Sequence, residues 1–156
     1  MFRTSQRWAP LPLRIMLGIA FLYHGWPKVF TSQGHQGFAG MLGGMGVPLP
    51  AITAWVVGLA EVLGGLALIA GAFVAIASAI LIVEMLVAMF TVHLPHGFNF
   101  VNITGMGKEG PVFGMPGAEV NLLYIAALLT LAIGGAGAWS VDTMRRDRQS
   151  VNSRPT

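Results

Sequence analysis

A nearly uninterrupted apolar run from residue 51 to residue 93 limits what this chain can fold into more than any other feature. The hydrocarbon core of a bilayer is about 30 Å thick, and ~20 apolar residues cross it as an α-helix. A single straight helix of this length would be ~60 Å long, about twice that thickness. We therefore predict two spanning helices, at about 51–71 and 73–93, joined by a tight hairpin at residues 71–73.

The composition agrees with a membrane protein. The chain is 54% hydrophobic and only 10% charged, whereas a soluble domain carries about 25% charged residues. It contains no cysteine, which excludes disulfides, thiol redox chemistry and cysteine-ligated iron–sulfur or zinc sites. The net charge of +3 comes mostly from the two ends of the chain, so it indicates membrane orientation and not a nucleic-acid partner.

The apolar segment before this run, at about residues 10–30, is predicted to be the first spanning helix. It contains Arg14, His24 and Lys28, and no small-residue cleavage site follows it. We therefore interpret it as a retained span and not as a signal peptide. Pro27 is expected to kink or end the helix. Helical spacing places five residues on one face, namely Arg14, Gly18, Phe21, Gly25 and Lys28.

Three further segments complete the predicted architecture. Residues 31–50 form a glycine-rich connection with a short interfacial or re-entrant part. Residues 94–118 form a loop rich in Gly, Pro and Asn, and residues 119–139 form a fourth span. The expected fold class is thus all-α, a polytopic membrane protein with a bundle of four transmembrane helices.

The predicted transmembrane domain covers residues 10–142, preceded by an N-terminal segment, 1–9, and followed by a basic tail, 143–156. Four spans place both termini on the same side of the membrane. Both ends are rich in arginine, whereas the only basic residue other than histidine in the two long loops is Lys108. The positive-inside rule then predicts cytoplasmic termini in the cell (inner) membrane, with the lipid bilayer as the first partner.

Glu61 lies near the middle of the second predicted span, within Gly58-Leu-Ala-Glu61-Val-Leu-Gly64-Gly65. An ionisable group at this depth is costly without a partner, so it is a candidate functional site. Gly58, Glu61 and Gly65 share one helix face, which lets a neighbouring helix approach the carboxylate. Glu61 could equally lock two helices together, and the sequence leaves both interpretations open.

Helix geometry predicts which polar groups meet Glu61. The first span runs outward and the second inward, and side chains lean toward the N-terminus of their own helix, so His24 and Lys28 lean toward Glu61. His93 lies at the outer end of the third span. Together these four residues predict a polar pocket that opens outward. It could hold a quinone headgroup, because histidine can donate to a quinone oxygen and a buried carboxylate can relay a proton.

Five other polar residues are secondary candidates: Arg14, Glu84, His96, Glu119 and Asp142. Arg14 is expected to pair with Asp142 or Glu84, and it would reach Glu61 only if the helices tilt or shift. It could also act as an interfacial anchor that snorkels.

Other cofactors are less favoured by the sequence. A haem held by His24 and His93 is one alternative to a quinone. His93 and His96 could share a metal, but no third ligand is evident, so no metal site is predicted. The sequence carries no catalytic motif, and whether the chain is itself an enzyme stays open.

Four motifs, in this order, resemble those of the DoxX family. They are Arg14-x3-Gly18-x2-Phe21-Leu22-x-His24-Gly25-x2-Lys28, Gly58-x2-Glu61-x2-Gly64-Gly65-x2-Leu68, His96-Gly97-Phe98 and Gly135-x-Gly137-x2-Ser140-x-Asp142. The resemblance covers about residues 10–142. It implies a four-helix integral membrane protein of bacterial or archaeal type. Some relatives are subunits of membrane oxidoreductases that pass electrons to quinones, including thiosulfate:quinone oxidoreductase, and others are encoded near redox or stress enzymes.

We therefore expect a membrane subunit of a quinone-linked oxidoreductase or redox-stress system, with a soluble oxidoreductase as partner. One alternative is a small-molecule transporter with a proton-linked site at Glu61 and His24, which would form a homo-oligomer. The inner half of the second span, residues 66–70, offers no ionisable group, which weakens this alternative. Another alternative is a non-catalytic membrane scaffold. Small residues four apart, such as Ala60 and Gly64, indicate close helix contacts within one chain or between copies.

Overall fold

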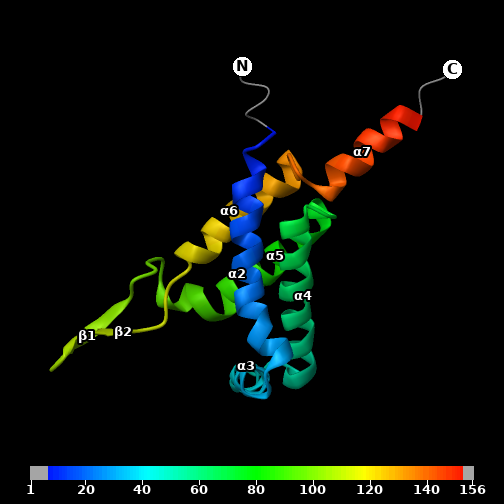
Figure 1. Ribbon diagram of the computed structural model, residues 1–156. Helices are drawn as coiled ribbons and strands as arrows, with labels where there is room; N and C mark the ends of the chain where they lie inside the picture. Colours follow the sequence, from blue (N-terminus) through cyan, green and yellow to red (C-terminus); the bar gives the residue numbers. More distant parts are fainter. Residues whose placement is uncertain (1–6, 153–156) are drawn as a thin grey trace.

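The computed structural model describes residues 7–152, and most of them are helical (Figure 1). The predicted segment 1–9 and the basic tail therefore lie partly outside the described residues, including Arg3 and Arg154. The elements in order are α2 (Pro10–Phe30), α3 (Ser32–Gly44), α4 (Pro50–Ala70), α5 (Val74–Ala88), a π-helical turn η1 (Met89–His93), a 3-10 turn η2 (Leu94–His96), β1 (Ile103–Gly107), β2 (Gly110–Phe113), α6 (Glu119–Gly134) and α7 (Val141–Asn152).

The helices pack as two pairs. α2 lies along α4, and α5 lies along α6. The pairs are close at the end where the two termini emerge and diverge toward the other end, where α3 packs against α2 and α4 (Figure 1). We call the first of these the terminal end and the second the α3 end.

Glycines bring α2 and α4 into close contact. A Cβ atom added to Gly18 would lie 2.7 Å from the carbonyl oxygen of Gly65, and one added to Gly58 would lie 2.9 Å from the Cβ of Lys28. Neither helix has room for a side chain at these positions. The predicted glycine-lined approach of a second helix to the Glu61 face is confirmed.

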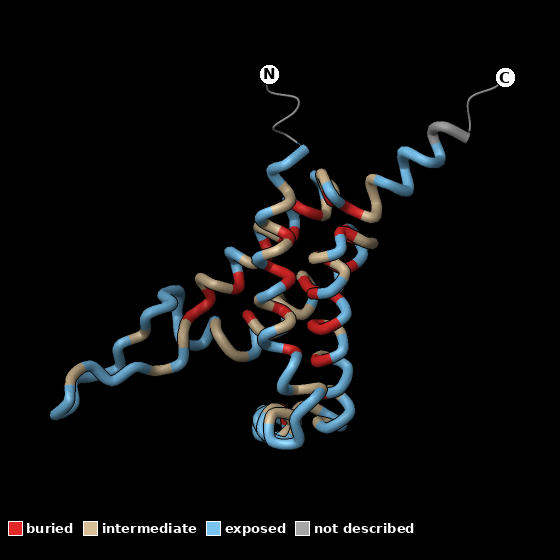
Figure 2. Tube along the Cα trace, viewed as in Figure 1, coloured by how far each residue is buried: buried red, intermediate tan, exposed pale blue. Residues whose placement is uncertain are grey.

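The core lies between the two pairs at the terminal end (Figure 2). Phe21 of α2, Leu68 of α4, Leu81 of α5 and Leu128 of α6 are almost fully buried and belong to one apolar cluster. Each comes from a different helix, so this layer joins all four. Side chains packed in this way hold the helices of a membrane protein together through van der Waals contacts.

The bounds of the first predicted helix and the position of the predicted hairpin match the structure. α2 runs from Pro10 to Phe30, and the chain turns between α4 and α5 through Gly71 and Phe73, both in the left-handed conformation. Pro27 does not end the helix at once, since α2 continues to Phe30.

The two segments predicted as a connection and a loop contain regular secondary structure. Most of residues 31–50 form α3, because the hydroxyl of Thr31 accepts a hydrogen bond from Gly34 N and caps the helix. Residues 94–118 contain an antiparallel hairpin in which β1 pairs with β2. The sequence analysis specified neither this helix nor this hairpin within the predicted connection and loop.

The fourth apolar segment is shorter than predicted. α6 ends at Gly134 and not near Trp139, because Gly135 adopts a φ of 80° that ends the helix. Among the described residues, Pro50–Ala70 and Val74–His96 are long and apolar enough to cross a membrane, and Glu119–Gly134 is a shorter apolar helix.

Candidate functional site

Lys28 and Glu61 form an ion pair between α2 and α4. Lys28 Nζ lies 2.6 Å from both carboxylate oxygens of Glu61. The side chains are 17% and 4% exposed, respectively. The ammonium also lies over the ring of Phe38 in α3, 4.3 Å from its centre. The pair satisfies the costly buried carboxylate, and Phe38 covers the cation on the α3 side.

Glu84 of α5 joins this pair. The side chain of Leu81 packs on Gly64, 3.0 Å from a Cβ atom added there. Glu61 on α4 and Glu84 on α5 each lie about one helical turn from that contact, toward the α3 end. Glu84 lies near enough to Glu61 and to Lys28 to interact electrostatically with both. We call Lys28, Glu61 and Glu84 the acid–base cluster.

The acid–base cluster has one fewer positive charge than it has carboxyl groups. With both carboxylates ionised, the three side chains would carry a net charge of −1, and an uncompensated charge is costly in a poorly hydrated site. Glu84 Oε2 is buried and has no hydrogen-bond partner among the described residues. Carboxyl groups this close in a poorly hydrated site favour sharing a proton over double ionisation. The arrangement can therefore take up or release one proton.

The histidines predicted for this site lie elsewhere. His24 is exposed, and its ring stacks edge-on against Tyr23. Nδ1 of His93 lies 2.9 Å from the carbonyl of Pro116, at the base of the β-hairpin. The predicted contact of Glu61 with Lys28 is present, whereas the preferred contact with His24 is replaced by one with Glu84.

The remaining outer candidates, His96 and Glu119, lie on either side of the β-hairpin in the sequence. His96 is exposed in η2. Glu119, at the start of α6, accepts a hydrogen bond from Phe100 N at 2.9 Å and so anchors the hairpin base. Within residues 7–152, neither residue forms a hydrogen bond or ion pair with the acid–base cluster.

Arg14 forms a separate polar centre at the terminal end. It is 1% exposed and donates through Nη2 to the carbonyl oxygens of Ala138 and Trp139. The predicted partners were Asp142 and Glu84. Asp142 is near enough to interact electrostatically with Arg14, but Glu84 lies in the acid–base cluster.

Asp142 holds the start of α5. Its two carboxylate oxygens accept hydrogen bonds from Phe73 N and Val74 N, at 2.8 and 2.9 Å, and its own N–H donates to Gly71 O. The carboxylate thus supplies the helix cap that Phe73 lacks. Arg14 and Asp142 together fasten residues 135–142 to the α4–α5 turn, which is a structural role.

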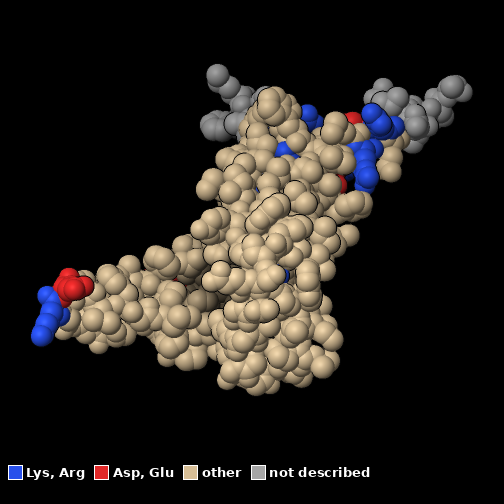
Figure 3. Space-filling model, turned by 60° about the horizontal axis from the view of Figure 1, so that its bottom comes forward, with Lys and Arg blue, Asp and Glu red and all other residues tan. Residues whose placement is uncertain are grey.

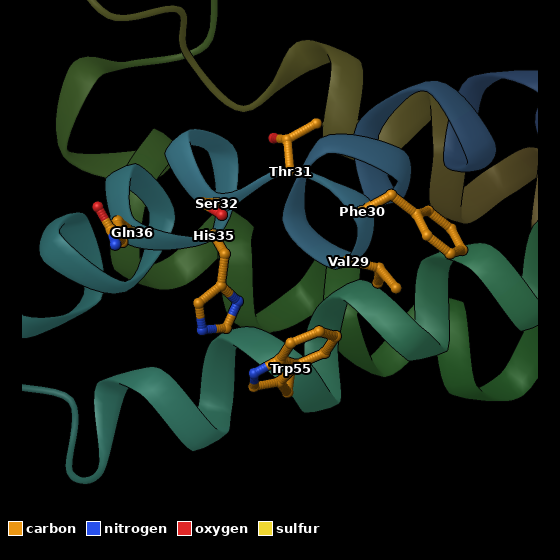
Figure 4. A pocket seen from close by; sticks show the side chains of 7 residues that line it. All are labelled: Val29, Phe30, Thr31, Ser32, His35, Gln36 and Trp55. Carbon is orange, nitrogen blue, oxygen red and sulfur yellow. The ribbon is translucent and has the colours of Figure 1, made fainter.

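A small pocket lies between the α2–α3 junction and α4 (Figure 4). Its volume is about 290 Å³, near the lower end of the range of about 300–1,000 Å³ for ligand pockets. It is lined by Val29, Phe30, Thr31, Ser32, His35, Gln36 and Trp55. The rings of His35 and Trp55, which both line the pocket, pack against each other with their centres 4.8 Å apart (Figure 4).

His35 was missed by the sequence analysis, which treated its segment as a connection. Its Nδ1 lies 3.1 Å from the carbonyl oxygen of Lys28. Because a carbonyl only accepts, Nδ1 carries the proton, and Nε2 of the neutral ring keeps a lone pair. The signal that could have found it is the helix-capping Thr31 four residues earlier.

No group of three or more potential ligands close enough to hold a metal occurs among the described residues. The polar centres described above are Lys28 with Glu61 and Glu84, Arg14 with two backbone carbonyls and Asp142, and His35 beside Trp55.

Comparison with known proteins gives a consistent family match. The family model named DoxX matches residues 9–94, a range that includes Arg14 and the whole acid–base cluster. An uncharacterised protein from Haemophilus influenzae is 32% identical over 131 residues, which cover 83% of this chain and 85% of that protein. No solved structure matches the chain.

Proposed function

The chain is a membrane protein of the DoxX family, and on this basis we propose that it is the membrane subunit of a quinone-linked oxidoreductase or a related redox-stress system. The acid–base cluster would manage protons during quinone turnover. A soluble oxidoreductase would supply or accept the electrons, because the sequence has no cysteine and no cofactor motif.

The proposed topology has four spans, formed by α2, α4, α5 with its terminal turns, and α6. The transmembrane domain would then cover residues 10–142 in the cell membrane, with both termini in the cytoplasm. α2 is as long as α4. Its Arg14 is bonded to the segment between α6 and α7, and its Lys28 to α4, which lowers the cost of placing them in a bilayer. The exposed arginines of α7 lie at the terminal end (Figure 3), which fits a cytoplasmic location.

The observation that carries the functional proposal is the contact among Lys28, Glu61 and Glu84. Intramembrane carboxyl groups that share a site with a lysine can hold a proton without leaving a large net charge. A quinone that accepts two electrons also takes up two protons, so a redox subunit needs such groups near its quinone. Because His24 and His93 lie away from the cluster, the pocket of His35 and Trp55 is the better headgroup site.

The pocket and the acid–base cluster adjoin the same turn of α2. His35 is bonded to the backbone carbonyl of Lys28, and the side chain of Lys28 is bonded to Glu61. An aromatic side chain such as Trp55 provides a surface for a flat ring, and Nε2 of His35 can accept a proton from a quinol hydroxyl.

Transport of a solute is less well supported. A transport path must continue past the acid–base cluster toward the terminal end. There the fully buried Phe21, Leu68 and Leu81 form an apolar layer. A scaffold role would use the cluster only to join three helices.

The test is purification in native lipid particles, followed by identification of bound quinone by mass spectrometry. Wild type is expected to retain quinone, and His35→Gln and Glu61→Gln to lose most of it. Glu119→Gln, which changes a carboxyl group away from the cluster, should retain quinone as wild type does. Absence of quinone from wild-type particles prepared from quinone-rich membranes would contradict the proposal, and a fall in stability alone for Glu61→Gln would favour a scaffold.

A further inference from the structure

The β-hairpin forms an arm whose base and strands are held together by hydrogen bonds. At its base, Gly117 N donates to Asn99 O, Ala118 N donates to Gly97 O, and Asn102 Nδ2 donates to Met115 O. The strands pair from Ile103 opposite Phe113 to Gly107 opposite Gly110, with a bulge between Ile103 and Gly105. Figure 1 shows the hairpin projecting sideways from the end of the α5–α6 pair, away from α2 and α4.

This arm carries very little charge for an exposed segment. Residues 85–118 contain only Lys108 and Glu109 among Asp, Glu, Lys and Arg, whereas about a quarter of the residues in a soluble domain are charged. Both charges lie in the turn between β1 and β2. Figure 3 shows the consequence, an uncharged arm with its charged residues gathered at the far tip.

The exposed residues of the arm are largely apolar. No residue of β1 or β2 is buried. Large apolar side chains that are at least half exposed continue from the end of α5 into the arm: Phe90, Leu94, Phe98, Phe100, Val101, Ile103, Met106, Val112 and Phe113. The apolar surface of a candidate membrane span, Val74–His96, is thus continuous with that of the hairpin.

The register separates the two faces of the hairpin. Met106 is paired with Pro111, and Ile103 with Phe113. Pro111 and Phe113 are two residues apart on β2 and share a face. Their partners Met106 and Ile103 lie on the same face, because the bulge between Ile103 and Gly105 shifts the alternation by one residue, so these four residues form one apolar face. The opposite face carries Val112 opposite Gly105 and, beside them, Gly107 opposite Gly110. One face therefore has large apolar side chains, and the other is mostly glycine.

We propose that the β-hairpin lies in the interfacial region of the lipid bilayer, with the face of Ile103, Met106, Pro111 and Phe113 toward the acyl chains. A two-stranded hairpin has open backbone N–H and C=O groups along its edges, and these cannot be satisfied in the hydrocarbon core. Its apolar face is unfavourable in water. The interface satisfies both requirements, because the edges and the glycine face reach headgroups and water.

The charged tip of the hairpin is also consistent with a position at the membrane interface. Lys108 and Glu109 can remain among headgroups and water while the residues on either side of them contact lipid. The hairpin then acts as a lateral anchor for the diverging α5–α6 pair. The placement depends on the chain being a membrane protein and does not depend on quinone binding.

The test uses single cysteines, since the natural chain has none. The full-length chain carrying Met106→Cys or Val112→Cys is labelled with an environment-sensitive fluorophore and placed in bilayers whose lipids carry bromine, a quencher, at a shallow or a deep acyl position. The Met106 probe is expected to be blue-shifted and to lose most of its fluorescence to shallow bromine, with a smaller loss to deep bromine. The probe at Val112 should lose much less.

Two results would overturn the proposal. Equal, weak quenching at both positions with water-like emission would show that the hairpin extends into solvent. An unquenched, blue-shifted probe at Met106, with energy transfer between labelled copies that disappears on dilution of the protein in lipid, would show that a second copy covers the face. A fluorophore on Glu109→Cys, at the tip, provides the reference value for water-like emission.

Discussion

Gly25 lies directly against the Cβ of Glu61, so that a Cβ atom on the glycine would come within 2.7 Å of it. The same atom would lie 3.0 Å from the carbonyl oxygen of Gly58. The buried carboxylate is therefore held at a close contact between the two helix backbones. Lys28, on the next turn of α2, reaches Glu61 only because this contact is so close.

Gly25→Ala is accordingly expected to force α2 and α4 apart and to destabilise the protein. Overpacking of this kind typically costs about 1–3 kcal/mol. Thermal unfolding in one detergent is the measurement. Gly37→Ala in α3 is the matched control, since a Cβ atom there meets nothing within 4 Å and helix propensity favours alanine by up to about 1 kcal/mol. Equal stability of the two variants would contradict the close contact.

Removal of one partner of the Lys28–Glu61 pair is expected to cost more than removal of both. Lys28→Met leaves a carboxylate buried beside Glu84, and loss of one partner of a buried pair typically costs about 3–5 kcal/mol. Adding Glu61→Gln to Lys28→Met should restore part of this stability. The four free energies of unfolding form a double-mutant cycle. Lys108→Met at the hairpin tip should have little effect, and strictly additive losses at Lys28 and Glu61 would show that the pair is not coupled.

The contact of Glu61 with α2 was predictable, whereas the partner assignment was only partly so. Gly25 and Lys28 are three residues apart and share a face, but His24 is rotated by about 100° from Gly25. That rotation places its ring outside the helix contact. Glu84 was not assigned to Glu61 because the packing of Leu81 on Gly64 fixes the relative height of α4 and α5, and spacing within one helix does not reveal it.

The surroundings of Arg14 and His35 were harder to predict for a different reason. Arg14 and His35 are both bonded to backbone carbonyls, which every residue carries and no sequence pattern marks. The turn that brings Ala138 O to Arg14 depends on positive φ angles at Gly135, Gly137 and Trp139. Only the two glycines indicate such a turn in the sequence.

Asp142→Ala is expected to weaken the junction between α5 and α7. It removes the acceptor for Phe73 N and Val74 N, and loss of a helix cap typically costs about 0.5–2 kcal/mol. It also removes the carboxylate nearest Arg14. Thermal unfolding should show a lower midpoint for Asp142→Ala, with a smaller loss for Asp142→Asn, which keeps one side-chain oxygen. Glu109→Ala at the exposed tip is the control, and an equal midpoint for all three variants would exclude the cap from a stabilising role.

Gly71→Ala tests whether Arg14 is packed on the α4–α5 turn. Gly71 has a φ of +66°, and a Cβ atom there would overlap Nη1 of Arg14 and the Cβ of Ser140. Gly46 has a similar φ of +76°, but a Cβ atom on it meets nothing within 4 Å. Both alanine variants carry the backbone cost of a left-handed residue, about 1–2 kcal/mol, and only Gly71→Ala must also displace Arg14.

The difference between these two alanine variants therefore isolates the contact with Arg14. Gly46→Ala is expected to fold with a modest fall in its unfolding midpoint. Gly71→Ala should show a much larger fall, together with faster hydrogen exchange at Phe73 and Val74, whose amides are held by Asp142. If both variants lost the same stability and retained slow exchange at those amides, the guanidinium could not occupy the space above Gly71.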